Sequence, residues 1–206
     1  MDPEILDGLA PDDPEAVKSR RDLQRINRLM GNSVWMSQAL EWAGEKTGGP
    51  IWELGAGDGV MLDPLVDAGW EVTGVDLAER PGDLPEGIGW RQGDVFDVLG
   101  DGVEGVVAAN LFLHHLSDEE LEKLGGLVSK CQVLCFSEPW RSRWALLEGA
   151  LLWPFVGRVT RHDMMVSIRA GFRTGELPTL LGLGDGWTIQ EQCTKLGAYR
   201  LLAWKK

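Results

Sequence analysis

Short apolar runs alternate with helical or loop-like segments along most of the chain after residue 50. Five of these runs have the length and composition of β-strands, and they lie near residues 51–54, 71–75, 88–92, 103–109 and 132–137. Strands that alternate with helical segments are typical of βαβ units, in which neighbouring strands run parallel. Two further runs, Trp187–Gln192 and Ala198–Trp204, predict an antiparallel hairpin at the sheet edge. We therefore expect an α/β fold with a doubly wound, mostly parallel sheet of seven strands.

Two helices are predicted ahead of the first strand. Apolar residues between Pro14 and Met30 recur near helical spacing, with basic residues between them. A second helix is expected to begin after Asn32 or Ser33 and to stop at the glycine pair 48–49. Both helices lie outside the alternating strand pattern, so they form an N-terminal addition to the sheet.

Short sequence patterns predict the segments that connect some of these strands. Residues 58–67 are expected to form the first crossover helix, whereas residues 77–89 contain two prolines and several glycines and predict a loop. Ser117 is followed three residues later by Glu120, which is a capping box that opens a helix running to about Lys130.

The chain of 206 residues has the length of one domain. We expect this domain to have four parts along the sequence. They are N-terminal helices in 1–49, a ligand-binding core in 50–139, a lid or acceptor insert in 140–182 and the terminal hairpin in 183–206.

Composition narrows the classes of partner and compartment. The net charge of -12 repels phosphate backbones, so nucleic acid is not expected as a partner. The first sixteen residues lack a basic region followed by a long apolar stretch, which predicts a cytoplasmic protein without a secretory signal. The most apolar run, residues 146–156, is shorter than the roughly 20 residues of a membrane span. Three cysteines without paired spacing predict neither a disulfide framework nor a metal site.

The most informative segment is IWELGAGDG, residues 51–59. Its glycines at positions 55, 57 and 59 allow close backbone approach to a ligand and left-handed backbone angles. Such a loop after a strand is typical of a nucleotide-type cofactor site. The dinucleotide pattern GxGxxG requires its third glycine three residues after the second, and here the spacing is two. An NAD-dependent oxidoreductase is therefore disfavoured.

Polar residues also follow the other predicted strands. Asp76 ends the second strand about twenty residues after the glycine loop, where a carboxylate can bind ribose hydroxyls. Asp94 and Asn110 are expected at the ends of the third and fourth strands, and Glu53 lies inside the first. Ligands of open parallel sheets bind beyond the carboxyl ends of the strands. These four side chains are therefore expected to line one cleft.

Taken together, these motifs resemble those of class I S-adenosylmethionine-dependent methyltransferases, over roughly residues 50–140 and the terminal hairpin. The resemblance implies S-adenosylmethionine as cofactor, S-adenosylhomocysteine as product and a Rossmann-like methyltransferase fold. It also implies that Glu53 binds near the methionine amine, that Asp76 holds the ribose and that Asp94 and Val95 bind the adenine. The residues expected to bind the cofactor are Glu53, Gly55, Ala56, Gly57, Asp76, Leu77, Asp94, Val95, Asn110 and Leu111.

Two later segments, residues 137–143 (SEPWRSR) and 159–177 (VTRHDMMVSIRAGFRTGEL), resemble small bacterial methyltransferases often encoded beside type III polyketide synthases. This resemblance implies a phenolic or polyketide-derived small-molecule acceptor. We expect the insert 140–171 to form the acceptor site. Its predicted substrate residues are Trp144, Arg161 and Met165, and Trp153, Phe155 and Met164 add apolar surface to the same predicted pocket.

Three histidines are candidates for a general base. An imidazole can act as a general base near neutral pH, and Asp163 could orient that of His162, although a helix N-terminal cap and a surface ion pair are the favoured explanation of the Arg161–Asp163 segment. His115 is the second candidate. If His114 and His115 were in a helix they would lie about 100° apart, so one of them is expected to be structural.

The sequence thus predicts methyl transfer from S-adenosylmethionine to a small molecule. An alternative is a module that binds the cofactor without catalysis, because a missing base leaves no trace in sequence. The identity of the acceptor, the atom methylated and the oligomeric state are left open.

Overall fold

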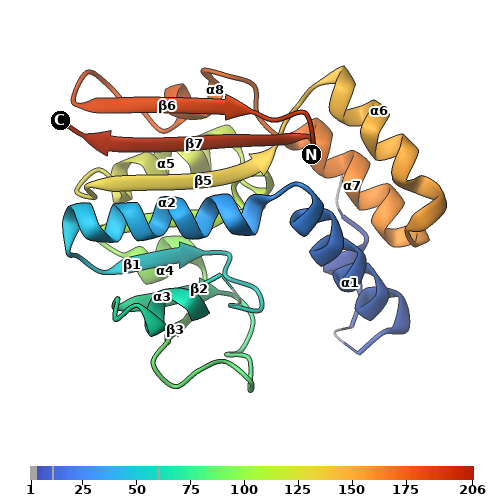
Figure 1. The fold of residues 1–206 in the computed structure, drawn as a ribbon, viewed down its shortest axis with the longest axis horizontal. Coiled ribbons are helices and arrows are strands. Elements are labelled where there is room, and N and C mark those ends of the chain that lie inside the picture. The colour runs from blue at the N-terminus through green and yellow to red at the C-terminus, as the bar shows by residue number, and fades with distance from the viewer. Residues whose placement is uncertain (1–3, 11, 60) are drawn as a thin grey trace.

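The computed structural model describes residues 4–10, 12–59 and 61–206. One seven-stranded sheet runs through these residues in the order β3-β2-β1-β4-β5-β7-β6 (Figure 1). Five strands are parallel, and β7 pairs antiparallel with both β5 and β6. Each predicted strand is present, with its ends shifted by at most three residues. The strands are β1 (Ile51–Leu54), β2 (Val72–Asp76), β3 (Gly89–Gln92), β4 (Val106–Asn110), β5 (Val133–Pro139), β6 (Trp187–Cys193) and β7 (Ala198–Lys205).

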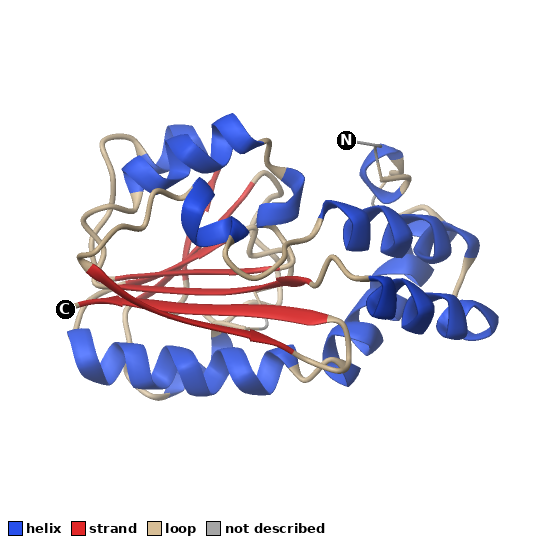
Figure 2. Cartoon of the chain, turned by 90° about the horizontal axis from the view of Figure 1, so that it is seen from above, coloured by secondary structure: helices blue, strands red, loops and turns tan. Residues whose placement is uncertain are grey.

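Helices cover both faces of this sheet (Figure 2). On one face, α2 (Asn32–Thr47) and α3 (Asp63–Asp67) pack onto the sheet through an apolar cluster that includes Met36, Leu40 and Leu65. The other face is covered by α4 (Val95–Leu99), α5 (Asp118–Leu127) and α8 (Glu176–Leu180), whose apolar side chains form a second cluster. The two clusters make the sheet a rigid platform for the residues at its ends.

A group of helices lies beyond the carboxyl ends of the parallel strands (Figure 1). It contains η1 (Leu6–Gly8), α1 (Pro14–Leu29), α6 (Arg143–Leu152), η3 (Trp153–Phe155) and α7 (Arg158–Ala170). A small apolar cluster, built on Ala145, Met164 and Ile168, joins α6 to α7. The N-terminal helix and the insert therefore share one side of the molecule, although they are far apart in sequence.

The order in which strands are added to the sheet reverses at β1. This strand pairs in parallel with β2 on one side and with β4 on the other, so the chain changes direction across the sheet at this point. Ligands of doubly wound sheets bind at such a switch point, beyond the carboxyl ends of the strands. Asp76 and Asn110 are the last residues of β2 and β4, and both lie at this edge.

The capping box predicted at Ser117 and Glu120 is confirmed. The Ser117 side chain accepts from the backbone of Glu120, and the Glu120 side chain accepts from the backbone of Ser117. The loop predicted after β2 is present as well, since residues 77–88 contain no helix. Among the described residues, no helix is both long enough and apolar enough to cross a membrane.

Three details differ from the sequence predictions. The crossover helix was predicted over 58–67 but begins only at Asp63, because Gly57 and Gly59 adopt left-handed φ angles of 56° and 67° that a right-handed helix excludes. Residue 60, within the predicted helix, lies outside the described residues. Helix α5 ends at Leu127, and the chain continues as turn to residue 130. Asp94 follows β3 as the N-cap of α4, and its Oδ1 accepts from Phe96 N at 2.8 Å.

Candidate active site

The glycine loop is fixed by the neighbouring strand. Gly55 N and Ala56 N both donate to the carbonyl of Val75, at 2.9 and 3.2 Å. Gly57 N donates to Asp76 Oδ2 at 2.8 Å, so the carboxylate predicted to hold a ribose also holds the loop. A Cβ on Gly55 would lie 2.4 Å from the ring of Phe112, which explains why this position has no side chain.

A first pocket of about 440 Å³ opens beside this loop. Six of the ten residues predicted to bind a cofactor line it: Gly55, Asp76, Leu77, Asp94, Val95 and Leu111. Ala56 and Gly57 belong to the loop itself, and Glu53 and Asn110 lie in the strands behind it. The predicted set is therefore brought together at the switch point of the sheet.

Glu53, in β1 behind the glycine loop, has a carboxylate oxygen to which no described residue donates a hydrogen bond. Its side chain is buried, with 2% of the residue exposed, and Oε2 has no hydrogen-bond partner among the described residues. Burial, together with the charges of Asp58 and Asp76, raises the pKa of Glu53 to about 8. The Oδ1 atom of Asn110 is likewise buried and without a partner in the described part of the chain. Unpartnered buried polar atoms are costly, so a ligand that supplies donors to these two oxygens would remove that cost.

A second pocket of about 470 Å³ lies against the first, and most of its lining is apolar. Helices α1, α6 and α7 and the N-terminal segment provide its walls. Its polar side chains are Glu4, His114, His115, Glu148 and Ser167. Leu111 and His115 line both pockets. A group held in the first pocket can therefore meet a molecule held in the second only beside these residues.

The segment between the pockets, residues 111–115, is held by one buried carboxylate. Glu138, near the end of β5, accepts from the backbone nitrogens of Phe112, Leu113 and His114, at 3.1, 2.8 and 3.3 Å. Leu111, just before these donors, has a φ of 56°, and it is the only non-glycine residue in the described chain with a positive φ. The turn includes η2 (Leu113–His115), and we call residues 111–115 the shared turn.

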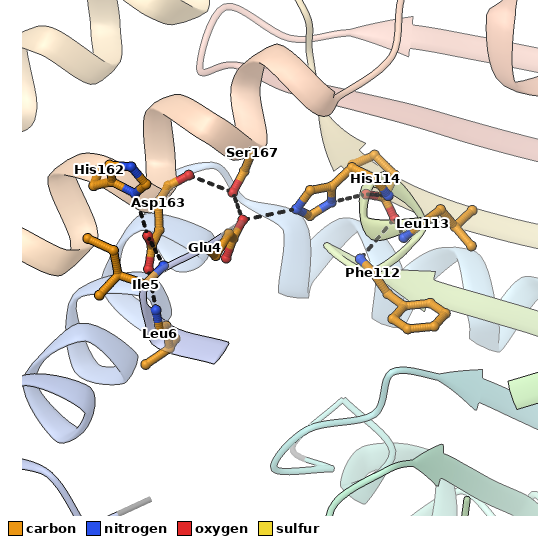
Figure 3. Close-up of polar contacts among 10 residues, drawn as sticks. Glu4, Ile5, Leu6, Phe112, Leu113, His114, His162, Asp163 and Ser167 are labelled. Carbon is orange, nitrogen blue, oxygen red and sulfur yellow. Dashed lines mark hydrogen bonds and ion pairs between the residues drawn. The ribbon is translucent and has the colours of Figure 1, made fainter. Parts of the chain in front are cut away.

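A chain of polar contacts continues from the shared turn to the N-terminal segment (Figure 3). His114 Nδ1 lies 2.7 Å from Glu138 Oε2, and Nε2 faces Glu4 Oε1 at 3.8 Å. Burial disfavours the charged imidazole, but the two carboxylates outweigh it and raise the pKa of His114 to about 9. Glu4 Oε1 also accepts a hydrogen bond from Ser167 Oγ on α7.

Asp163 anchors the same segment one turn earlier on α7. Its two carboxylate oxygens accept from Ile5 N at 2.8 Å and Leu6 N at 3.0 Å, and the side chain is fully buried (Figure 3). One interpretation of the sequence makes Asp163 part of a helix N-terminal cap. The helix begins at Arg158, however, so Asp163 lies inside it and does not cap it. It satisfies the amides of η1 instead.

The predicted catalytic and substrate residues are dispersed. His115 lies at the junction of the pockets, whereas His162 is 45% exposed, contacts Asp163 Oδ1 at 3.0 Å and is absent from the lining of both pockets. Trp144 is 52% exposed and donates to the Lys195 carbonyl, and Arg161 donates to the Val156 carbonyl. Met165 packs against the apolar cluster of α6 and α7. Their assigned roles stay predictions.

Two expectations can be compared with the local geometry. His114 and His115 lie in a 3₁₀ turn rather than an α-helix, and their ring centroids are 4.2 Å apart. Together with Glu4 they present ligand-type atoms within 4.8 Å of one another. Of the apolar residues expected to form an acceptor pocket, Met164 lines the second pocket, whereas Trp153 and Phe155 are exposed and line neither pocket.

No protein-family model matches the sequence, and no curated protein sequence matches it either. Solved structures do match the fold. The plantazolicin methyltransferase BpumL, in complex with a monoazolic desmethylPZN analog and S-adenosylhomocysteine, superposes with a TM-score of 0.70 at 12% identity over 94% of this chain and 91% of that one. The chain has the methyltransferase fold. The magnesium protoporphyrin IX methyltransferase ChlM from Synechocystis PCC 6803 (TM-score 0.59, 19% identity, 89% and 87% covered) and the methyltransferase domain of bacterial CtHen1-C (0.60, 17%, 84% and 98%) are further neighbours.

Sequence reasoning missed several residues of this methyltransferase fold that build the site. Phe112, Leu116 and Glu120 line the first pocket, and Glu4, Glu148 and Ser167 line the second. The capping box marked Glu120 as a structural residue only. Glu138 carried a usable signal, because a carboxylate near the end of an apolar strand requires partners.

Proposed function

We propose that this protein transfers the methyl group of S-adenosylmethionine to a small, largely apolar acceptor. The observation that carries the proposal is the meeting of two pockets at Leu111 and His115, one lined by the carboxylates of Asp76 and Asp94 beside the glycine loop and one mainly apolar. Methyl transfer needs two ligands in contact at one point, and this arrangement provides it.

The chemistry of the first pocket fits S-adenosylmethionine. Glu53 has a buried, unpartnered carboxylate oxygen, and the cofactor's ammonium group is a cationic donor that would satisfy it. Asp76 ends β2 at the pocket, where a ribose would be held through its hydroxyls. The loop lacks the dinucleotide glycine spacing, which suits a cofactor without pyrophosphate. The bound cofactor would supply an electrophilic methyl group on a cationic sulfur.

The residues of this chain would then act mainly by positioning. The glycine loop and Asp76 would fix the cofactor, the shared turn would separate the two ligands except at Leu111 and His115, and the apolar walls would exclude water from the acceptor. The structural neighbours are named as methyltransferases, which supports the same class of reaction. The resemblance of residues 137–143 and 159–177 supports a phenolic or polyketide-derived acceptor.

Isothermal titration with S-adenosylhomocysteine tests the proposal directly. We expect micromolar binding to the unmodified protein and at least a tenfold loss for Asp76→Ala, with Asp83→Ala in the neighbouring loop as the matched control. An absence of binding at millimolar ligand would contradict the proposal. Binding without turnover of any phenol, quinone or amine would instead favour a cofactor-binding module.

A further inference from the structure

We propose that Glu4 accepts the hydrogen of the acceptor's nucleophilic group, so that the acceptor is an apolar molecule bearing an O–H or N–H. This inference rests on the proposed function and assigns a catalytic residue to it. Glu4 precedes the first predicted helix and belongs to no motif, yet the structure places it in the wall of the second pocket.

The position of Glu4 is fixed from two sides. Asp163 accepts from the amides of Ile5 and Leu6, the two residues that follow Glu4, and so clamps the segment onto α7. The side chain of Glu4 is held by Ser167 Oγ and faces His114 Nε2 (Figure 3). A carboxylate held through both its backbone and its side chain is preorganised for an incoming ligand.

Glu4 also lies at the correct end of the pocket. Its carboxylate is within 4.8 Å of ligand-type atoms of His114 and His115, and His115 is one of the two residues common to both pockets. The helices α1 and α6 contribute apolar residues such as Leu23, Ile26 and Leu152 to the lining of the same pocket. An amphipathic acceptor would therefore place its polar group beside Glu4 and its apolar part among the helices.

The charge state of Glu4 suits a hydrogen-bond acceptor. Burial disfavours its ionisation, but the contacts with His114 and Ser167 outweigh burial and lower the pKa of Glu4. Both nitrogens of His114 face carboxylates, so the imidazole acts as a donor on each side. The lining of the second pocket contains no lysine or arginine among the described residues, so an anionic acceptor such as a carboxylate has no cationic partner there.

The reaction step balances with these groups. The O–H or N–H proton of the acceptor passes to the Glu4 carboxylate as the acceptor's lone pair forms a bond to the methyl carbon. The carbon–sulfur bond breaks, and its electron pair stays on sulfur to give neutral S-adenosylhomocysteine. The proton on Glu4 is then released to solvent when the product leaves.

Two probes that differ in this one hydrogen test the assignment. 4-Hexylphenol and its methyl ether, 4-hexylanisole, are titrated separately into the full-length protein saturated with S-adenosylhomocysteine, in buffer containing EDTA. We expect the phenol to bind at least about tenfold more tightly, because a hydrogen bond to a charged group is worth that much. In Glu4→Gln the preference should fall below about threefold, while the affinity for the anisole stays unchanged.

The anisole separates loss of a hydrogen bond from loss of structure. A variant whose N-terminal segment has simply detached would bind both probes more weakly, which would overturn the assignment. Equal binding of the probes to the unmodified protein, binding of neither, or a preference that appears only when the titration is repeated without EDTA would overturn it as well. The exposed Glu122→Gln serves as the matched control and should retain the full preference. Glu4→Gln should bind S-adenosylhomocysteine as tightly as the unmodified protein does. If the proposed function is wrong, the unmodified protein itself will not bind S-adenosylhomocysteine.

Discussion

The imidazole of His114 and the carboxylate of Glu138 form a buried pair, with Nδ1 and Oε2 2.7 Å apart. The pair joins the end of β5 to the turn that follows β4, and Glu138 also accepts three backbone donors of that turn. A single carboxylate thus determines the shape of the wall between the two pockets.

The pair makes stability depend on pH. The folded-state pKa of His114 is about 9, above the unfolded value of 6.5, so the folded protein holds this proton more tightly. The resulting stabilisation is fully present below pH 6.5 and is lost as pH rises through 9, with a magnitude on the order of 3 kcal/mol. Urea unfolding at pH 6 and pH 9.5 should show this loss in the unmodified protein and a much smaller one in His114→Asn. Parallel pH dependence of the two proteins would contradict the pairing.

Replacing the Glu53 carboxylate should raise the free energy of unfolding and lower the affinity for S-adenosylhomocysteine. Its folded-state pKa of about 8 exceeds the unfolded value of 4.5, so the free energy of unfolding falls as pH rises between these values. Glu53→Gln removes this effect and should be more stable than the unmodified protein at pH 8.5, by up to about 5 kcal/mol, and nearly equal to it at pH 4.5. Its affinity for S-adenosylhomocysteine should fall at least about tenfold, because the charge-assisted bond is lost. Thermal unfolding and calorimetry measure the two effects, and unchanged affinity would remove Glu53 from the cofactor site.

At position 111 a glycine variant should be more stable than an alanine variant, which is the reverse of the usual order. At a φ of 56° a residue with a Cβ is strained by about 1 to 2 kcal/mol, and glycine is not. We therefore expect Leu111→Gly to be more stable than Leu111→Ala by about 1 kcal/mol, although both lose the apolar contacts of leucine. Denaturant unfolding of the two variants is sufficient for this comparison. An alanine variant as stable as the glycine variant would show that residue 111 does not hold its left-handed conformation.

The clamp formed by Asp163 can be examined without any ligand. Asp163→Asn replaces one of the two oxygens that accept from Ile5 N and Leu6 N. Amide hydrogen exchange of residues 5 and 6 should accelerate at least about tenfold, while exchange in the strands stays unchanged. The exposed Asp83→Asn provides the control. If the two amides exchange at the same rate in both variants, Asp163 does not hold the N-terminal segment.

Patterns that depend on neighbouring residues predicted the fold well. The parallel strands, the terminal hairpin, the glycine loop and the capping box at Ser117 all rest on contacts or periodicities within a few residues. Asp76 could be placed beside the glycine loop because parallel strands end at a common edge.

The second pocket could not be read in the same way. Glu4 reaches Ser167 across 163 positions, and Glu138 reaches the backbone of Phe112 across 26. Such partners are set by how the insert packs against the N-terminal segment, and neither side carries a periodic pattern that specifies the other. His162 and Asp163 illustrate the limit: their side chains are in contact as expected, but Asp163 is buried on α7 against the N-terminal segment, and His162 is 45% exposed and lines neither pocket.

The shared turn has a consequence for the order of events during turnover. Leu111 and His115 would contact both ligands, so the two binding equilibria are linked through one short segment. Linkage is reciprocal: whatever factor the cofactor applies to acceptor affinity, the acceptor applies to cofactor affinity. The rate at which one product departs would then depend on whether the other still occupies its pocket, and residues 111–115 would set that dependence.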